Sequence, residues 1–128
     1  MISTPYQKYQ QSSVQTASPA QLIIMLYDGA IRFVRQGVES IEKRNIEKAN
    51  YNLIKAQNII HELIASLNFQ YPLSTDLARI YEYMLHLLIT ANMNKSKEPA
   101  DEVLSHLIDL KEAWSQAAKQ VVSSAHHG

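Results

Sequence analysis

The sequence contains no cysteine, so it forms neither disulfide bonds nor thiolate metal sites. It has only three glycines and four prolines, and no strand-like alternation of polar and apolar residues lies between them. Lysine and arginine together number 12, as do aspartate and glutamate, so the net charge at pH 7 is zero. A nucleic-acid-binding protein normally carries a basic excess that neutralises phosphates. The charge balance therefore argues against nucleic acid as a partner.

Long apolar runs are also missing. None approaches the roughly 18 residues that a membrane-spanning helix requires. The first residues, MISTPYQKYQQSS, lack the apolar core of a signal peptide. The sequence therefore predicts a cytoplasmic protein with no membrane insertion.

Motifs for catalysis are absent as well. There is no Gly-x-Ser-x-Gly elbow and no glycine-rich phosphate loop. A ferritin-like metal centre needs two Glu-x-x-His pairs that point into a bundle, whereas Glu82/His86 and Glu102/His106 are each spaced by four. We expect no enzyme, no catalytic residue, no cofactor and no metal site. A metal- or cofactor-binding bundle is the alternative from a different functional class.

What the sequence does contain is helical periodicity. Apolar residues recur at spacings of three and four along four segments, which predicts four amphipathic helices. The predicted helices span about 19–43, 46–69, 75–93 and 99–123. Their short connections place consecutive helices antiparallel. The sequence therefore predicts an all-α, up-down-up-down four-helix bundle over 18–123, a helical or extended N-terminal lid segment over 1–17, and a disordered tail over 124–128.

Helix-capping residues support these boundaries. Ser18 is followed by proline and, at the third helical position, by glutamine, which is the capping-box pattern. Asn45 is the expected N-cap of the second helix. The second predicted helix is expected to end before Pro72, because the residue before a proline avoids helical geometry. The third helix is then expected to restart at Ser74 or Thr75.

The first predicted helix has more apolar surface than a bundle requires. Its front half carries two adjacent apolar groups, which include Leu22, Met25, Leu26, Tyr27 and Ile31. A bundle helix needs only one apolar stripe about 100° wide. Two interpretations remain open and are compatible: the N-terminal segment covers the surplus through Tyr6 and Tyr9, or a partner helix does so.

A mixed strip on the second predicted helix indicates a partner surface as well. It alternates isoleucine with polar side chains and consists of Asn50, Ile54, Gln57, His61, Ile64 and Asn68, of which the first five are the candidate partner residues. Such a strip suits a groove that packs apolar anchors and hydrogen-bonds a partner. A solvated flank with incidental isoleucines is the alternative interpretation.

Three stretches, PYQKYQ, VQTASPAQLIIMLYDGAIRF and NLIKAQNIIHELIASLN, together resemble the FliS family of flagellar export chaperones. The later stretches YEYM, LLITAN and EAW fit the same pattern, so the resemblance covers about residues 5–118. It implies an antiparallel four-helix protein that binds newly made flagellin in the cytosol. Such a protein holds the C-terminal segment of flagellin, blocks premature polymerisation and aids delivery to the flagellar type III export apparatus.

The resemblance also implies roles for particular residues. Tyr6 and Tyr9 match lid tyrosines that flagellin displaces, and the two apolar groups of the first helix match the family's apolar motif. Residues 55–60 match the motif of the second helix. Export-gate components and other flagellar regulators are further implied partners. A helical regulatory adaptor for another flagellar protein is the alternative among binding proteins.

Two positions depart from the family pattern. Thr4 stands where asparagine is common, and Gly37 stands where alanine is common. We expect Gly37 to loosen the first helix by up to ~1 kcal/mol.

Overall fold

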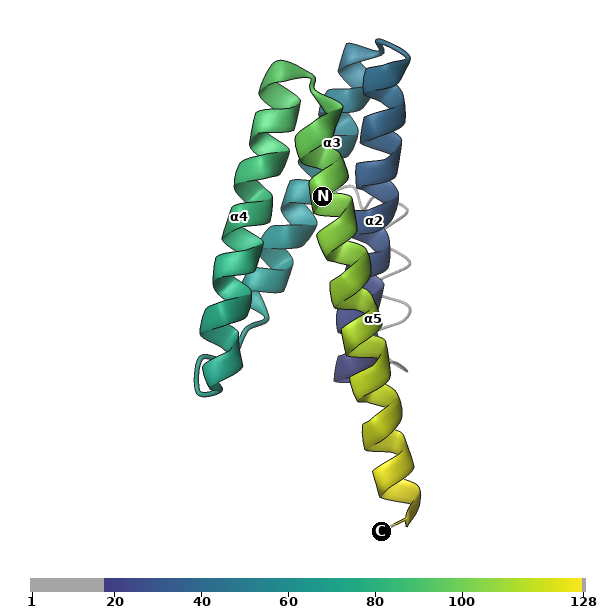
Figure 1. Ribbon diagram of the computed structural model, residues 1–128, viewed down its shortest axis with the longest axis vertical. Helices are drawn as coiled ribbons and strands as arrows, with labels where there is room; N and C mark the ends of the chain where they lie inside the picture. Colours follow the sequence, from purple (N-terminus) through teal and green to yellow (C-terminus); the bar gives the residue numbers. More distant parts are fainter. Residues whose placement is uncertain (1–17, 128) are drawn as a thin grey trace, which may run out of the picture.

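The computed structural model describes residues 18–127, with side chains described through residue 120. It contains four helices, α2 (Pro19–Glu42), α3 (Ile46–Ala65), α4 (Pro72–Asn94) and α5 (Lys97–His127). Consecutive helices run in opposite directions, and α2 and α4 each pack against both α3 and α5 (Figure 1). The prediction of an antiparallel four-helix bundle is therefore confirmed. The predicted lid segment lies outside the described residues.

Two helices begin at the predicted caps. Ser18 Oγ accepts a hydrogen bond from the backbone N–H of Gln21 at 3.2 Å, and the Gln21 side chain accepts from the Ser18 N–H at 2.9 Å. Asn45 Oδ1 accepts from the Lys48 N–H at 3.1 Å at the start of α3. Each such cap satisfies backbone donors that no helical carbonyl reaches, and typically contributes about 1 kcal/mol.

The connection between α3 and α4 differs from the prediction. The third predicted helix restarts at Ser74 or Thr75, whereas α4 already begins at Pro72. Tyr71 is extended, with φ −95° and ψ 130°, as the residue before a proline prefers. Pro72 occupies the first helical position, where its missing N–H costs nothing. Ser74, a predicted start of this helix, lies inside its first turn, and its hydroxyl donates to the Asn68 carbonyl at 2.6 Å.

Helix α5 is longer than predicted at both ends. It starts at Lys97, two residues before Pro99, and it remains helical through His127. The predicted tail at 124–128 therefore overlaps the last residues of α5, and its disorder stays a prediction. No glycine or proline interrupts the chain between Pro99 and Gly128, so nothing in the sequence stops the helix. At about 1.5 Å per residue, α5 extends past the ends of the other helices (Figure 1).

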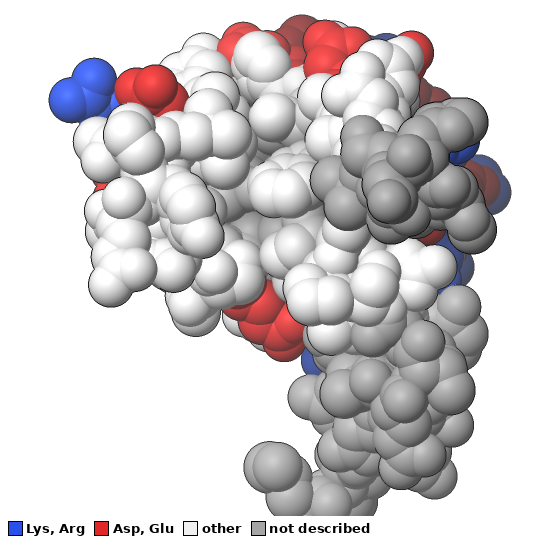
Figure 2. All heavy atoms as spheres, turned by 90° about the horizontal axis from the view of Figure 1, so that it is seen from below, with Lys and Arg blue, Asp and Glu red and all other residues white. Residues whose placement is uncertain are grey.

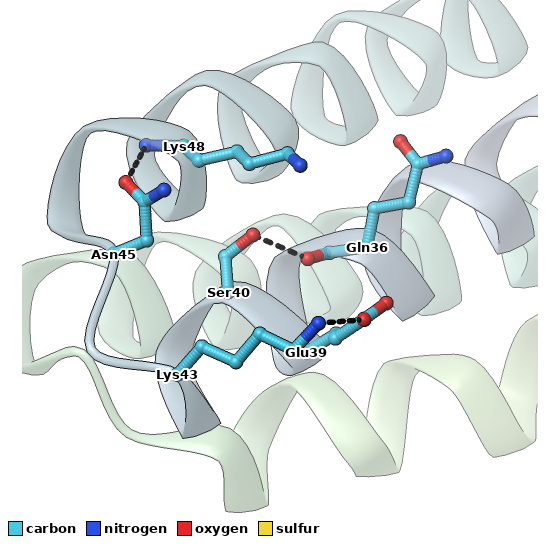
Figure 3. Close-up of a pocket in the computed structure, with 6 residues that line it drawn as sticks. All are labelled: Gln36, Glu39, Ser40, Lys43, Asn45 and Lys48. Carbon is cyan, nitrogen blue, oxygen red and sulfur yellow. Dashed lines mark hydrogen bonds and ion pairs between the residues drawn. The ribbon is translucent and has the colours of Figure 1, made fainter.

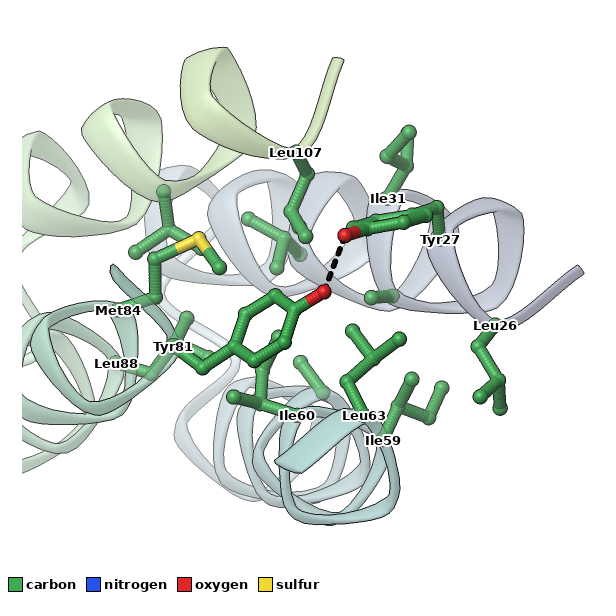
Figure 4. Packing of buried hydrophobic residues seen from close by; sticks show 14 of the residues in the cluster. Leu26, Tyr27, Ile31, Ile59, Ile60, Leu63, Tyr81, Met84, Leu88 and Leu107 are labelled. Atoms are coloured by element: carbon green, nitrogen blue, oxygen red, sulfur yellow. Dashed lines mark hydrogen bonds between the residues drawn. The ribbon is translucent and has the colours of Figure 1, made fainter. Parts of the chain in front are cut away.

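The core fills the axis of the bundle with side chains from all four helices (Figure 4). Its largest fully buried members are Tyr27, Val34, Leu53, Ile60, Leu63, Tyr81, Met84, Leu88, Val103 and Leu107. Burial of each such apolar side chain contributes on the order of 1.5–3 kcal/mol relative to exposure. The core is thus continuous along the axis.

Gly37 lies where α2 and α3 approach each other closely. A Cβ at this position would lie 2.8 Å from Leu53 Cδ2 and 3.0 Å from Leu53 Cγ. Contacts this short require the neighbouring side chain to move. Besides its low helix propensity, Gly37 therefore has a packing role that the sequence analysis did not identify.

Arg44 offers a test of backbone strain in the α2–α3 connection. Its φ is 58°, a left-handed conformation that glycine adopts without the Cβ penalty. We expect Arg44→Gly to raise the free energy of unfolding by about 0.5–1 kcal/mol, measured by urea denaturation. The control Arg44→Ala keeps a Cβ and should be no more stable than the parent. An unchanged or lower stability of Arg44→Gly would contradict this interpretation.

Candidate partner-binding site

Two adjoining cavities open at the end of the bundle where α2 begins and α3 ends. Their volumes are about 490 and 240 Å³, and they share Leu73, Leu77 and Trp114. We call the combined cavity the end groove. Its other walls come from the start of α2, the α3–α4 connection, α4 and α5, and include Ile23, Tyr71, Tyr81, Leu110 and Ala113. The volume lies in the range typical of binding sites, and the lining is mostly apolar.

Large apolar side chains surround this groove on the protein surface. Phe69, Tyr71 and Leu73 are all exposed, Leu73 by 61%. The face that contains the groove is hollowed and carries few charged side chains (Figure 2). A contiguous apolar patch with a hollow typically marks an interaction site. The end groove is therefore the candidate site for a partner with an apolar surface.

Three aromatic residues from three helices meet at the inner wall of the groove. Trp114 Nε1 of α5 donates to the Tyr27 hydroxyl of α2 at 3.1 Å, and the Tyr27 and Tyr81 hydroxyls hydrogen-bond across the bundle (Figure 4). Burial raises the pKa of Tyr27 and also that of Tyr81. Both hydroxyls therefore keep their protons near neutral pH. Tyr81 and Trp114 line the groove.

The predicted partner residues of α2 divide into two groups. Leu26, Tyr27 and Ile31 are buried members of the core, and Tyr27 has no exposed surface. The 3.6-residue period turns these side chains toward the bundle axis, so their role in partner binding stays a prediction. Leu22 and Met25 are half-buried, so part of each side chain is accessible to a partner.

The predicted strip on α3 lies along the side of that helix nearest α4. Asn50 Oδ1 accepts from Asn92 Nδ2 of α4 at 2.8 Å, so part of its amide is already used within the bundle. Ile54 and His61 are exposed, whereas Gln57 and Ile64 are half-buried. The structure thus brings the five residues together on one side of α3, but only some remain accessible. Tyr6 and Tyr9 lie outside the described residues.

Several residues of the end groove were missed by the sequence analysis. The sequence analysis gave no partner-binding role to Leu73, Leu77 or Trp114. A usable signal was present in the connection NFQYPL, where Phe69, Tyr71 and Leu73 alternate with other residues. Three large apolar side chains in a segment that is usually polar indicate an exposed apolar surface.

A cavity at the opposite end of the bundle is polar (Figure 3). The Ser40 hydroxyl donates to the Gln36 carbonyl at 2.7 Å, and Lys43 Nζ donates to Glu39 Oε1 at 2.6 Å. The bond from Lys43 lowers the pKa of Glu39, and the same bond raises the pKa of Lys43. These groups satisfy one another and help to close the turn between α2 and α3.

Glu102 and His106, considered above as possible metal ligands, form a surface pair at 3.1 Å. The Tyr83 hydroxyl also donates to Glu102 at 2.6 Å, and this bond lowers the pKa of the carboxyl group. Within the part of the chain that is described, no three histidine, aspartate or glutamate residues gather in a way that would hold a metal ion. None of the described helices has both the length and the hydropathy needed to cross a bilayer.

Comparison with known proteins identifies several close relatives. Residues 2–121 match the family described as flagellar protein FliS. The chain is 41% identical over 125 residues to the flagellar secretion chaperone FliS of Bacillus subtilis (strain 168), covering 98% of this chain and 94% of that protein. It is 35% identical over 109 residues to the flagellar secretion chaperone FliS of Salmonella typhimurium, covering 83% and 81%. A solved structure described as a flagellar chaperone from bacteria has a TM-score of 0.75 at 22% identity, covers 90% of this chain and 95% of that chain, and supports the fold alone.

Proposed function

Because the chain belongs to the FliS family of flagellar secretion chaperones, we propose that it binds the C-terminal segment of flagellin in the cytoplasm. Binding would prevent premature polymerisation and aid delivery to the flagellar type III export apparatus. The observation that carries this proposal is the end groove, an apolar site that the described residues leave open. No catalytic step is part of the proposed function.

The physical basis of the proposal is the match between two apolar surfaces. A segment that drives polymerisation must present apolar side chains to its neighbours, and the same side chains can pack against Leu73, Leu77 and Trp114. Each 100 Å² of apolar surface removed from water contributes about 2.5 kcal/mol before the cost of ordering the segment. A segment that folds on binding can also wrap a large surface.

Further contacts are proposed outside the groove. The accessible members of the α3 strip, Ile54 and His61, lie on the side of α3 nearest α4, and Leu22 and Met25 lie on α2. A flagellin segment longer than the groove would reach these positions. Export-gate components and other flagellar regulators are proposed as additional partners of the loaded chaperone.

The N-terminal segment is proposed to act as a displaceable lid. In sequence, residues 1–17 are joined through Ser18 to Pro19 and Ala20, which form part of the groove wall. The lid therefore joins the bundle at the edge of the site that flagellin would occupy. Tyr6 and Tyr9 are its proposed apolar anchors.

Titration with a peptide from the flagellin C-terminus tests the proposed function. We expect an equimolar complex, a gain of helicity in circular dichroism, and a negative heat-capacity change from buried apolar surface. Trp114 is the only tryptophan, so its fluorescence should shift to shorter wavelength when the groove is filled. Affinity should depend weakly on salt, because apolar contacts are not screened.

A peptide of the same composition in scrambled order serves as the control and should not bind. If the native peptide produces neither heat nor added helicity, the proposed function is wrong. Binding without any change in Trp114 emission would place flagellin outside the end groove.

A further inference from the structure

An open cavity of about 380 Å³ lies between α2 and α5, which pack against each other along the bundle (Figure 1). Its walls come from residues three or four positions apart, which share one face of their helix. They are Asp28, Arg32 and Arg35 of α2, and Ile108 and Lys111 of α5. None of the described residues that line this cavity also lines the end groove. The bundle thus has a hollow that the proposed flagellin site does not use.

The lining of this cavity is predominantly cationic. Arg32, Arg35 and Lys111 contribute three positive charges and Asp28 contributes one negative charge, so the lining carries a net charge of +2. The whole chain, in contrast, has a net charge of zero at pH 7. The cavity is therefore a local concentration of positive charge on a balanced protein, and it attracts anionic groups.

Two of these cations are held in place by neighbouring side chains. Lys111 Nζ lies 2.6 Å from Asp28 Oδ1, in an ion pair that joins α5 to α2. The guanidinium carbon of Arg32 lies 5.4 Å from the centre of the Phe33 ring, within cation–π range. Side chains that are already ordered lose less conformational freedom when a partner binds. Arg32 and Arg35 are also exposed, so a partner in solution reaches both.

Two isoleucines give the same cavity an apolar component. Ile31 is nearly buried at 7% exposure, whereas Ile108 is 39% exposed and offers apolar surface beside the cations. An apolar side chain that covers such surface gains about 25 cal/mol for each Å² removed from water. Proteins that bind nucleic acid through phosphates normally carry a basic excess, and this chain has none. The combination fits a protein segment that has both carboxylates and apolar side chains.

We propose that the α2–α5 cavity binds an acidic, amphipathic segment of a partner protein. Carboxylates of the segment would pair with Arg32 and Arg35, since a guanidinium donates two parallel N–H bonds to one carboxylate. An apolar side chain between them would pack on Ile108. The inference goes beyond flagellin binding, because a site separate from the end groove allows the chaperone to hold another protein while flagellin is bound.

Fluorescence anisotropy with a labelled acidic peptide tests this proposal on the full chain. The probe is a peptide of three Glu-Leu-Glu-Glu repeats, and we expect saturable binding. Arg35→Glu should weaken the affinity at least tenfold, because one carboxylate loses its partner and meets a like charge. Arg79→Glu is the matched control: Arg79 is an exposed helical residue of α4 outside the cavity, and its substitution changes the net charge equally. Its affinity should stay within about twofold of the parent.

Three further probes separate the proposed partner from other anions. A peptide with serine in place of leucine should bind about fivefold more weakly, and one with lysine in place of glutamate should not bind. An oligothymidylate of the same length should bind at least tenfold more weakly than the acidic peptide. Equal affinities of Arg35→Glu and Arg79→Glu would overturn the proposal, because general charge attraction would then explain the binding. Absence of saturable binding, an undiminished affinity for the serine peptide, or equally tight binding of the oligothymidylate would overturn it as well.

Discussion

Replacing Leu73 with glutamate is expected to lower the affinity for the flagellin C-terminal peptide at least a hundredfold. Leu73 lines both cavities of the end groove, so a bound segment would bury the introduced charge against apolar side chains. Burial of an unpaired carboxylate costs several kcal/mol, and the apolar contact of the leucine is lost in addition. Isothermal titration calorimetry measures the change.

The fold should tolerate this substitution. Leu73 is already 61% exposed, and it lies in the first turn of α4, where the helix dipole favours a negative charge. We expect the free energy of unfolding to change by no more than about 0.5 kcal/mol. Ile46→Glu is the matched control, because Ile46 is an exposed apolar residue in the first turn of α3, outside the groove. If the two variants bind the peptide equally well, the end groove is not the flagellin site.

Truncating Leu53 to alanine is expected to lower the free energy of unfolding by about 2–5 kcal/mol. Leu53 is fully buried in the core, and the loss combines a smaller apolar side chain with an unfilled cavity. Domains of this size are usually stable by only about 5–15 kcal/mol, so the effect is large. Urea denaturation followed by circular dichroism measures it.

A second substitution shows whether the packing at Gly37 is responsible. Gly37→Ala alone gains up to ~1 kcal/mol of helix propensity but meets Leu53 Cδ2 at 2.8 Å, so we expect a net loss of about 0–2 kcal/mol. In the double variant the new methyl group enters the space that Leu53 leaves. The double variant should therefore be more stable than the sum of the single changes predicts, by about 1 kcal/mol. Simple additivity would contradict the close approach of α2 and α3.

Local signals in the sequence predicted the fold well. Ser18 and Asn45 start their helices through side-chain bonds to nearby backbone groups, so a few neighbouring residues decide the outcome. The start of α4 was misplaced because Pro72 has two compatible roles: it ends regular structure before it and begins a helix after it. The sequence pattern does not separate these roles.

The candidate site was harder to predict because it depends on how helices are arranged around one another. Tyr27 lies in the apolar motif of the first helix, and periodicity alone does not tell which neighbour covers it. In the structure Trp114 and Tyr81 reach it from α5 and α4, 87 and 54 positions away in sequence. The walls of the end groove likewise come from α2, the α3–α4 connection, α4 and α5, which no single stretch of the sequence brings together.

The order of the helices has a consequence for folding kinetics. Three of the four helix pairings join consecutive segments, and such local contacts favour folding in microseconds to milliseconds. The pairing of α2 with α5 instead closes a long loop, as the contact of Lys97 with Glu42 at 3.6 Å illustrates. Loop closure of this kind has an entropic cost that local pairing avoids. We therefore expect α5 to dock last, and a chain still being synthesised would acquire its binding groove only after its final helix has left the ribosome.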